Sequence, residues 1–245
     1  MQNAIEIDRL NVHLGKADIL HDVSIAIPAG RIVALLGPSG TGKTTLVKAV
    51  MGMNPISSGS IAVFEKSVPS FAAISEIGYM AQTDALYEDI CALDNLLFFG
   101  SLYGVRGKAA RERAIELLEF TDLADDRNKL IKHFSSGMKR RLSLAIALMN
   151  SPRLLLLDEP TVGIDPVLRR KFRDKFLQLK EDGCTIFMTT HVMDEALSCD
   201  EVLLMRGGEI IASGTADALI RGADAHDLEE AFLHYIGASQ KEAKS

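Results

Sequence analysis

Hydrophobic and polar residues alternate in the first part of the chain, whereas short runs further on are almost entirely apolar. The alternation over residues 4–10 and 19–27 predicts two strands that each bury one face. The runs at residues 32–36, 154–157 and 185–190 predict strands buried on both faces, which is typical of a parallel sheet covered by helices. Shorter strands are expected at residues 61–64, 77–81, 202–205 and 209–212.

Helical spacing of apolar residues fills the segments between these strands. Helices are expected at residues 43–52, 138–149, 167–180 and 193–199, with two short ones near the end of the chain. Residues 83–134 show helical spacing at 95–103 and 108–120 and few strand signals, so we expect a helical insertion there. Strands that alternate with helices place the chain in the α/β class.

A glycine-rich stretch follows the first wholly apolar strand and precedes a predicted helix. Residues 37–44 match the phosphate-loop pattern G-x-x-x-x-G-K-[ST], although a merely structural glycine-rich turn is the alternative. Glycines let backbone N–H groups turn toward phosphate oxygens, and the N-terminus of the following helix adds a favourable dipole. Lys43 would reach the β- and γ-phosphates, and the Thr44 hydroxyl would bind Mg²⁺. The candidate ATP-binding residues are Gly37, Pro38, Ser39, Gly40, Thr41, Gly42, Lys43, Thr44 and Thr45.

Two acids, Asp158 and Glu159, come directly after the apolar run at residues 154–157. Ligands of open α/β sheets bind at the carboxyl ends of the strands, where these acids are expected. Carboxylates at the end of an apolar strand need a charged partner, and Mg²⁺ beside the phosphates would supply one. Asp158 suits the metal site and Glu159 suits a base that polarises the attacking water. The alternative is an acid pair that caps a helix.

With these motifs in place, the sequence resembles the ATP-binding-cassette (ABC) ATPases over nearly its whole length. Further elements of that family match in order: Gln82 after a short strand, Ser135, Ser136, Gly137 and Met138 at the signature, Asp165 in the Asp loop, and His191 after a buried strand. The resemblance implies that Gln82 touches Mg²⁺ and senses a transporter, and that the signature contacts the γ-phosphate of ATP held by the opposite subunit. It assigns catalytic roles to Glu159, His191 and Gln82, and Mg²⁺ binding to Thr44, Gln82 and Asp158.

The resemblance also implies a fold and a domain organisation. It indicates a P-loop NTPase with a largely parallel core sheet, an N-terminal antiparallel β portion and an inserted α-helical subdomain. We expect residues 1–82 and 151–245 to form the nucleotide-binding core. Residues 83–150 are expected to form the helical subdomain that carries the signature.

The sequence departs from the family pattern at three positions. Ser136 replaces the first glycine of the signature, where a Cβ could crowd the phosphate, and Met138 replaces its glutamine. Leu14 or His13 stands where the family has the aromatic residue that stacks on adenine, so we expect the base to be held weakly. The run from Met138 to Arg141 is similar to the subfamily that energises exporters.

Basic and aromatic residues of the insertion each leave two interpretations open. Lys139, Arg140 and Arg141 lie in the first turn of a predicted helix, where cations oppose the helix dipole. They either relieve this conflict by binding an anion or form a solvated basic face.

Six of the 14 aromatic residues lie in residues 83–134, and they form either the core of the insertion or an exposed patch for a partner. These six are Tyr87, Phe98, Phe99, Tyr103, Phe120 and Phe134.

Composition narrows the class of protein and of partner. The net charge of −6, with 27 basic and 33 acidic residues, does not suit a partner with a nucleic-acid backbone. No apolar run approaches the roughly 20 residues of a membrane span. Three cysteines without a CxxC pair predict reduced thiols in a cytoplasmic protein.

The function that the sequence favours is an ATPase subunit that dimerises around two ATP–Mg²⁺ and powers a separate membrane permease, most simply for export. Its partners would be that permease and either a second copy or a related ATPase, at the cytoplasmic face of the cell membrane. One alternative is a soluble ABC ATPase without a transport role, for example in iron–sulphur cluster assembly. A module that binds ATP without useful turnover is a third class, against which intact Glu159 and His191 argue.

Overall fold

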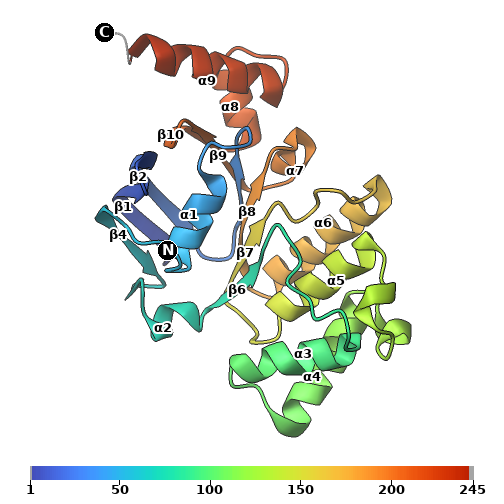
Figure 1. The fold of residues 1–245 in the computed structure, drawn as a ribbon. Coiled ribbons are helices and arrows are strands. Elements are labelled where there is room, and N and C mark those ends of the chain that lie inside the picture. The colour runs from blue at the N-terminus through green and yellow to red at the C-terminus, as the bar shows by residue number, and fades with distance from the viewer. Residues whose placement is uncertain (1, 243–245) are drawn as a thin grey trace.

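Two β-sheets and a set of helices make up the computed structural model, which describes residues 2–242 (Figure 1). The larger sheet has the strand order β10-β9-β3-β8-β7-β6 and is parallel except for β10, which pairs antiparallel with β9. Its strands are β3 (Ile32–Leu36), β6 (Ile77–Met80), β7 (Leu154–Asp158), β8 (Thr185–Thr190), β9 (Glu201–Arg206) and β10 (Glu209–Gly214). Every residue of β3, β7 and β8 is buried, as the apolar runs predict.

The two faces of this sheet pack against different partners. Side chains of β3 alternate between them: Ile32, Ala34 and Leu36 pack on the side of the later helices, and Val33 and Leu35 pack toward α1 (Lys43–Val50). A second, antiparallel sheet with the order β2-β1-β4-β5 covers α1 on that side. Its strands are β1 (Asn3–Leu14), β2 (Ala17–Pro28), β4 (Ser58–Val63) and β5 (Lys66–Ser67). The predicted antiparallel N-terminal portion and parallel core are confirmed.

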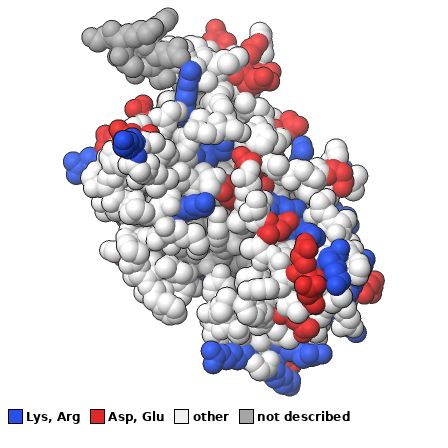
Figure 2. All heavy atoms as spheres, viewed as in Figure 1, with Lys and Arg blue, Asp and Glu red and all other residues white. Residues whose placement is uncertain are grey.

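Helices between β6 and β7 pack on one another beside the larger sheet. They are α3 (Ala92–Leu102), α4 (Gly107–Phe120) and α5 (Ser136–Ala147), with the 3-10 turns Ala124–Asp126 and Ile131–His133. Leu96, Leu117 and Leu144 are buried in their common core. Acidic and basic side chains intermingle over this part of the face shown in Figure 2.

The aromatic residues of the insertion divide between the two interpretations. Phe134 is buried in the core and Phe120 packs against it. Tyr87 and Phe98 remain 51% and 39% exposed, with ring centroids 4.7 Å apart in an edge-to-face pair. One group of aromatic side chains therefore builds the core of the insertion, and another lies at its surface.

The remaining helices lie mostly along the second half of the chain. They are α2 (Phe71–Ile74), α6 (Pro166–Glu181), α7 (Met193–Leu197), α8 (Ala216–Gly222) and α9 (Leu228–Glu242). The expectation of two short terminal helices is wrong for α9, which has 15 residues because Leu228 and Phe232 anchor it in the core. Within residues 2–242, no helix combines the length and apolar character that a membrane crossing requires.

Candidate functional site

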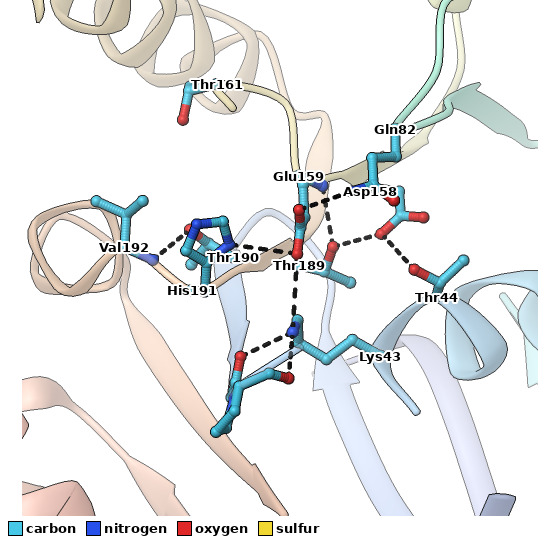
Figure 3. A network of polar contacts seen from close by, with 12 residues as sticks. Lys43, Thr44, Gln82, Asp158, Glu159, Thr161, Thr189, Thr190, His191 and Val192 are labelled. Carbon is cyan, nitrogen blue, oxygen red and sulfur yellow. Dashed lines mark hydrogen bonds and ion pairs between the residues drawn. The ribbon is translucent and has the colours of Figure 1, made fainter. Parts of the chain in front are cut away.

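The residues that the sequence singles out converge at the carboxyl ends of four neighbouring strands. The phosphate loop follows β3, Asp158 ends β7, and His191 follows β8. Gln82 lies just beyond β6 at the edge of the sheet. Carboxyl ends of parallel strands share one edge of the sheet, so these segments are brought together although they are far apart in sequence (Figure 3).

Two glycines of the phosphate loop are required by its path. Gly42 has φ +103°, a conformation that side-chain-bearing residues rarely adopt, and it directly precedes α1. A Cβ on Gly37 would lie 2.4 Å from the carbonyl oxygen of Met205. Pro38, Ser39 and Gly40 form the exposed crest, and the Thr41 hydroxyl donates to the Pro38 carbonyl across 2.9 Å.

Helix α1 begins without a side-chain cap. The first N–H groups of an α-helix have no acceptor inside the helix, so they remain available to a ligand. Together with the helix dipole they favour an anion. The N-terminus of α1 therefore has the donors that a phosphate group needs.

The ammonium group of Lys43 is held inside the loop. Its Nζ donates to the carbonyls of Gly37 and Pro38 at 2.7 and 2.9 Å and lies 3.8 Å from Glu159 Oε1. Burial lowers the pKa of Lys43, while the carboxylates of Glu159 and Asp158 oppose that shift. The cation is thus poorly solvated and close to where phosphate oxygens would enter.

Oxygen donors gather between α1 and β7. Thr44 Oγ1 donates to Asp158 Oδ1 at 3.2 Å, and Thr189 Oγ1 donates to the same oxygen at 2.6 Å. Asp158 is 1% exposed, and the side-chain amide of Gln82 lies nearby (Figure 3). A hydroxyl, a carboxylate and an amide oxygen suit Mg²⁺, which takes few protein ligands and completes its shell with water and phosphate. The donor set fits that ion even though residues 2–242 contain no cluster of three or more His, Cys, Asp or Glu that could hold a metal.

The carboxylate of Glu159 is the centre of the polar network. Oε2 accepts from Gln82 Nε2 at 3.0 Å, and Oε1 lies 3.3 Å from His191 Nδ1. The backbone of Glu159 is left-handed, with φ +49°, and its N–H donates to Thr189 Oγ1 at 3.0 Å. This conformation costs about 1–2 kcal/mol for a residue with a Cβ, so the surrounding contacts must hold it.

The signature residues start α5, which lies apart from α1 and the phosphate loop before it (Figure 1). Ser135 is the N-cap, and its Oγ accepts from Met138 N at 3.3 Å. Ser136 lines a hollow together with Gln82 and residues of the segment before α6. A Cβ on Gly137 would lie 2.9 Å from Leu168 Cδ2, so a larger residue there would displace the tip of that leucine side chain.

Asp165 and Leu14 have simpler surroundings. Asp165 caps α6, where its Oδ1 accepts from Val167 N and Leu168 N at 2.9 Å each. Leu14 ends β1 and is 39% exposed. Weak binding of the base at Leu14 stays a prediction.

The interpretation of Arg140 as part of a solvated basic face is wrong, because the residue is 5% exposed. Its guanidinium points inward and donates to backbone carbonyls and to the carboxylate of Asp84. The anion that Arg140 binds therefore belongs to its own chain. Arg141 likewise donates to carbonyls, those of Thr121 and Asp122. The sequence shows these charges but not that loop carbonyls converge on them.

A second carboxylate, Glu195, is a residue of this region that sequence reasoning missed. Its Oε2 accepts a hydrogen bond from Thr190 Oγ1 at 2.6 Å, and its Oε1 accepts one from Thr161 Oγ1. Arg169 Nε lies 3.7 Å from Oε1. Burial raises its pKa, against the hydroxyl and the cation that favour the charged form. Two threonines at the end of a buried strand were the only signal for such a network.

A sequence profile of the ABC transporter family matches residues 20–162. The linearmycin resistance ATP-binding protein LnrL of Bacillus subtilis is 38% identical over 214 residues, 86% of this chain and 69% of LnrL. The probable multidrug ABC transporter ATP-binding protein YbhF of Escherichia coli is 37% identical, and the match covers 98% of this chain but only 43% of YbhF. The Nod factor export ATP-binding protein I of Burkholderia lata is 37% identical over 93% of this chain and 76% of its own length.

Solved structures give the same picture. The ATP binding subunit of an ABC transporter superposes with a TM-score of 0.86 at 26% identity, covering 95% of this chain and 99% of that one. Clostridium perfringens cbiO1, part of the ABC transporter complex cbiONQ, gives 0.80 at 26% identity over 91% of this chain and 95% of its own.

Proposed function

This chain belongs to the ABC transporter family, and we propose that it is an ATP-hydrolysing subunit that powers export through a separate membrane permease. The observation that carries the proposal is the contact of Glu159 with Lys43, Gln82 and His191. These contacts lie next to the N-terminus of α1, which no side chain caps. A carboxylate beside a phosphate site can accept a proton from the attacking water.

The proposed mechanism assigns one task to each side chain. Backbone N–H groups of α1 and the ammonium of Lys43 bind the β- and γ-phosphates. Thr44, Asp158 and Gln82 would hold Mg²⁺, which neutralises charge on the phosphate oxygens when bound. Glu159 accepts a proton from water as its oxygen attacks the γ-phosphorus, and the bond to the β–γ bridging oxygen breaks to leave ADP and phosphate. His191 positions the γ-phosphoryl group.

The second ligand set of each ATP would come from another subunit. Ser135 to Met138 start α5 away from the phosphate loop of their own chain, so a head-to-tail dimer, of two copies or with a related subunit, would place them against ATP there. The proposed division has residues 1–82 and 151–245 as the nucleotide-binding core and 83–150 as the helical subdomain.

Relatives support transport over the alternatives. LnrL, YbhF and the Nod factor protein are named for resistance, multidrug transport and export, and none is named for iron–sulphur assembly. We therefore place the chain at the cytoplasmic face of the cell membrane, bound to its permease. In its own cells it should sediment with membranes, and expressed alone it should stay in the supernatant.

Glu159→Gln tests the catalytic proposal. Glutamine keeps the shape but is not a base, so hydrolysis should fall by about 100-fold or more while ATP binding persists. Uncleaved ATP should then hold two subunits together, so the variant should run as a dimer with ATP–Mg²⁺ on a sizing column and as a monomer without nucleotide. Glu209→Gln, at an exposed acid of β10, is the matched control and should hydrolyse ATP normally. Undiminished turnover by Glu159→Gln would remove Glu159 as the base.

A further inference from the structure

The side chain of Arg140 reaches from α5 to the backbone of the segment that carries Glu159. Its Nη2 donates to the Glu159 carbonyl at 2.8 Å and its Nε donates to the Pro160 carbonyl at 3.2 Å. These two carbonyls follow β7 directly, where the chain turns through the left-handed conformation of Glu159. Arg140 thus holds the peptide groups on the far side of that turn.

The same guanidinium also holds the segment that follows β6. Its Nη1 donates to the carbonyls of Ala81 and Gln82 at 2.9 and 3.0 Å and to Asp84 Oδ1 at 3.2 Å. Asp84 is fixed in turn by the hydroxyl of Ser143, one turn further along α5, at 2.7 Å. One side chain therefore bridges three parts of the chain: α5, the Gln82 segment and the Glu159 segment.

We propose that Arg140 is a positioning residue for ATP hydrolysis, which fixes Glu159 and Gln82 relative to helix α5. The inference rests on the proposed function, since it concerns the same reaction. Glu159 is held from both sides: its N–H by Thr189 and its C=O by Arg140. The orientation of those two peptide groups sets φ and ψ of Glu159, and with them the direction of its carboxylate toward Lys43 and His191.

Geometry and burial explain why this position needs arginine. The side chain is 6% exposed, so each of its N–H groups must find an acceptor within the protein. A guanidinium offers five N–H donors in a rigid plane. Here Nε and Nη2 each donate to one carbonyl after β7, and Nη1 shares its two N–H groups among two carbonyls and one carboxylate after β6. An ammonium has three donors at a single point and cannot span both segments, so Arg140→Lys keeps the charge but loses the bridge.

Arg141, the next residue, provides a matched control. It lies on the same helix and also donates to two carbonyls, those of Thr121 and Asp122 at 3.2 and 2.8 Å. Both acceptors belong to the end of α4 rather than to the Glu159 or Gln82 segments. Arg141→Lys is therefore the same substitution on the same helix, and it disturbs two carbonyl contacts, one part-buried and one exposed, without reaching the site.

The test compares ATPase kinetics of Arg140→Lys and Arg141→Lys. We expect Arg140→Lys to lower kcat by about tenfold or more with KM for ATP within about twofold, and Arg141→Lys to leave both within about twofold. Arg140→Lys disturbs more hydrogen bonds, and more deeply buried ones, than Arg141→Lys, so its melting temperature should fall further. The two kcat values are therefore compared at a temperature well below both melting transitions, where both variants are folded. Equal losses of kcat in the two variants, or a loss confined to KM, would overturn the proposal.

A double-mutant cycle asks whether Arg140 acts through Glu159. In the Glu159→Gln background the base is already lost, so adding Arg140→Lys should change the residual rate by less than about twofold. A further tenfold loss in that background would show that Arg140 does not act through Glu159, and it would overturn the proposed positioning of that residue. Should Arg140→Lys not fold, Asp84→Ala removes the carboxylate that accepts from Arg140 and Ser143. We expect it to lower kcat about threefold at constant KM, and an unchanged kcat would overturn the proposal.

Failure of this inference is distinguishable from failure of the proposed function. Wild-type hydrolysis that Glu159→Gln abolishes, combined with an unchanged Arg140→Lys, would leave the ATPase in place and remove only the role of Arg140. A wild-type chain without any ATP hydrolysis that depends on Glu159 would remove both.

Discussion

Helices α1 and α5 are both proposed to point their N-termini at the phosphates of ATP, but they begin in different ways. Helix α1 follows Gly42, whose φ of +103° is a conformation that glycine adopts far more readily than other residues. No side chain caps this helix. Helix α5 follows Ser135 in an extended conformation, and the serine hydroxyl accepts from the N–H of Met138. One N-terminus is left for a ligand, and the other is partly satisfied by its own chain.

Cations near the two helix starts differ in the same sense. Lys43 turns back into the phosphate loop and stays within reach of an incoming phosphate. Arg140 points into the core and Lys139 is paired with Glu88. The start of α5 therefore offers mainly a hydroxyl and backbone N–H groups, which is a weaker set of donors for a phosphate. If both helix starts bind ATP as proposed, we expect firm binding at the start of α1 and a weaker, reversible contact at the start of α5.

Removing Lys43, the cation at the start of α1, should have the largest effect on ATP binding. Lys43→Ala takes away the buried ammonium that reaches the phosphates, so the Kd for ATP should rise by about 100-fold or more. Equilibrium titration with a fluorescent ATP analogue measures this. Lys48→Ala, at the exposed lysine in the last turn of α1, is the matched control and should bind normally. Equal affinities of the two variants would take Lys43 out of the site.

The start of α1 could be predicted from the sequence, whereas the inward orientation of Arg140 in α5 could not. The phosphate-loop pattern and the acids after β7 are local signals, and the alternation of strands and helices predicted the α/β class. Gln82 and His191 were identified only through the family resemblance, because a lone glutamine or histidine at the end of a strand has no specific signal. Arg140 and Glu195 were not predictable in the same way. The partners of Arg140 are mostly carbonyls of segments distant in sequence, and almost any residue type supplies a carbonyl. Glu195 accepts from Thr190 nearby but also from Thr161, which is distant in sequence. The length of α9 was predictable, because Leu228, Phe232, Tyr235 and Ile236 follow helical spacing and pack on the core.

Weakening the proposed contact of the start of α5 with ATP should have an intermediate effect. Ser135→Ala removes the cap of α5 and should lower the free energy of unfolding by about 1 kcal/mol. It should also weaken the ATP-dependent dimer of the Glu159→Gln variant by about tenfold while monomer binding of ATP stays unchanged. Thr215→Ala removes the equivalent cap of α8, so it should cost similar stability and leave the dimer intact. Sedimentation at graded protein concentrations compares the two, and equal dimer constants would mean that α5 does not touch ATP across the interface.

Restoring the family glycine at the start of α5 should have the smallest effect. Ser136 is exposed in the first helical turn, so Ser136→Gly removes a Cβ and eases the approach of the backbone to the opposing γ-phosphate. Glycine there weakens the helix by at most about 1 kcal/mol, which partly offsets that gain. The ATPase rate should therefore stay equal or rise about twofold to threefold, measured at saturating ATP and high protein concentration, where mass action favours the dimer. A large fall in the rate would mean that the Ser136 hydroxyl itself binds the phosphate. In that case α5 would hold ATP through two serine side chains rather than through its backbone. The two helices would then differ in the groups that bind the phosphate, hydroxyls at α5 and an ammonium with backbone N–H groups at α1, rather than in how tightly they bind it.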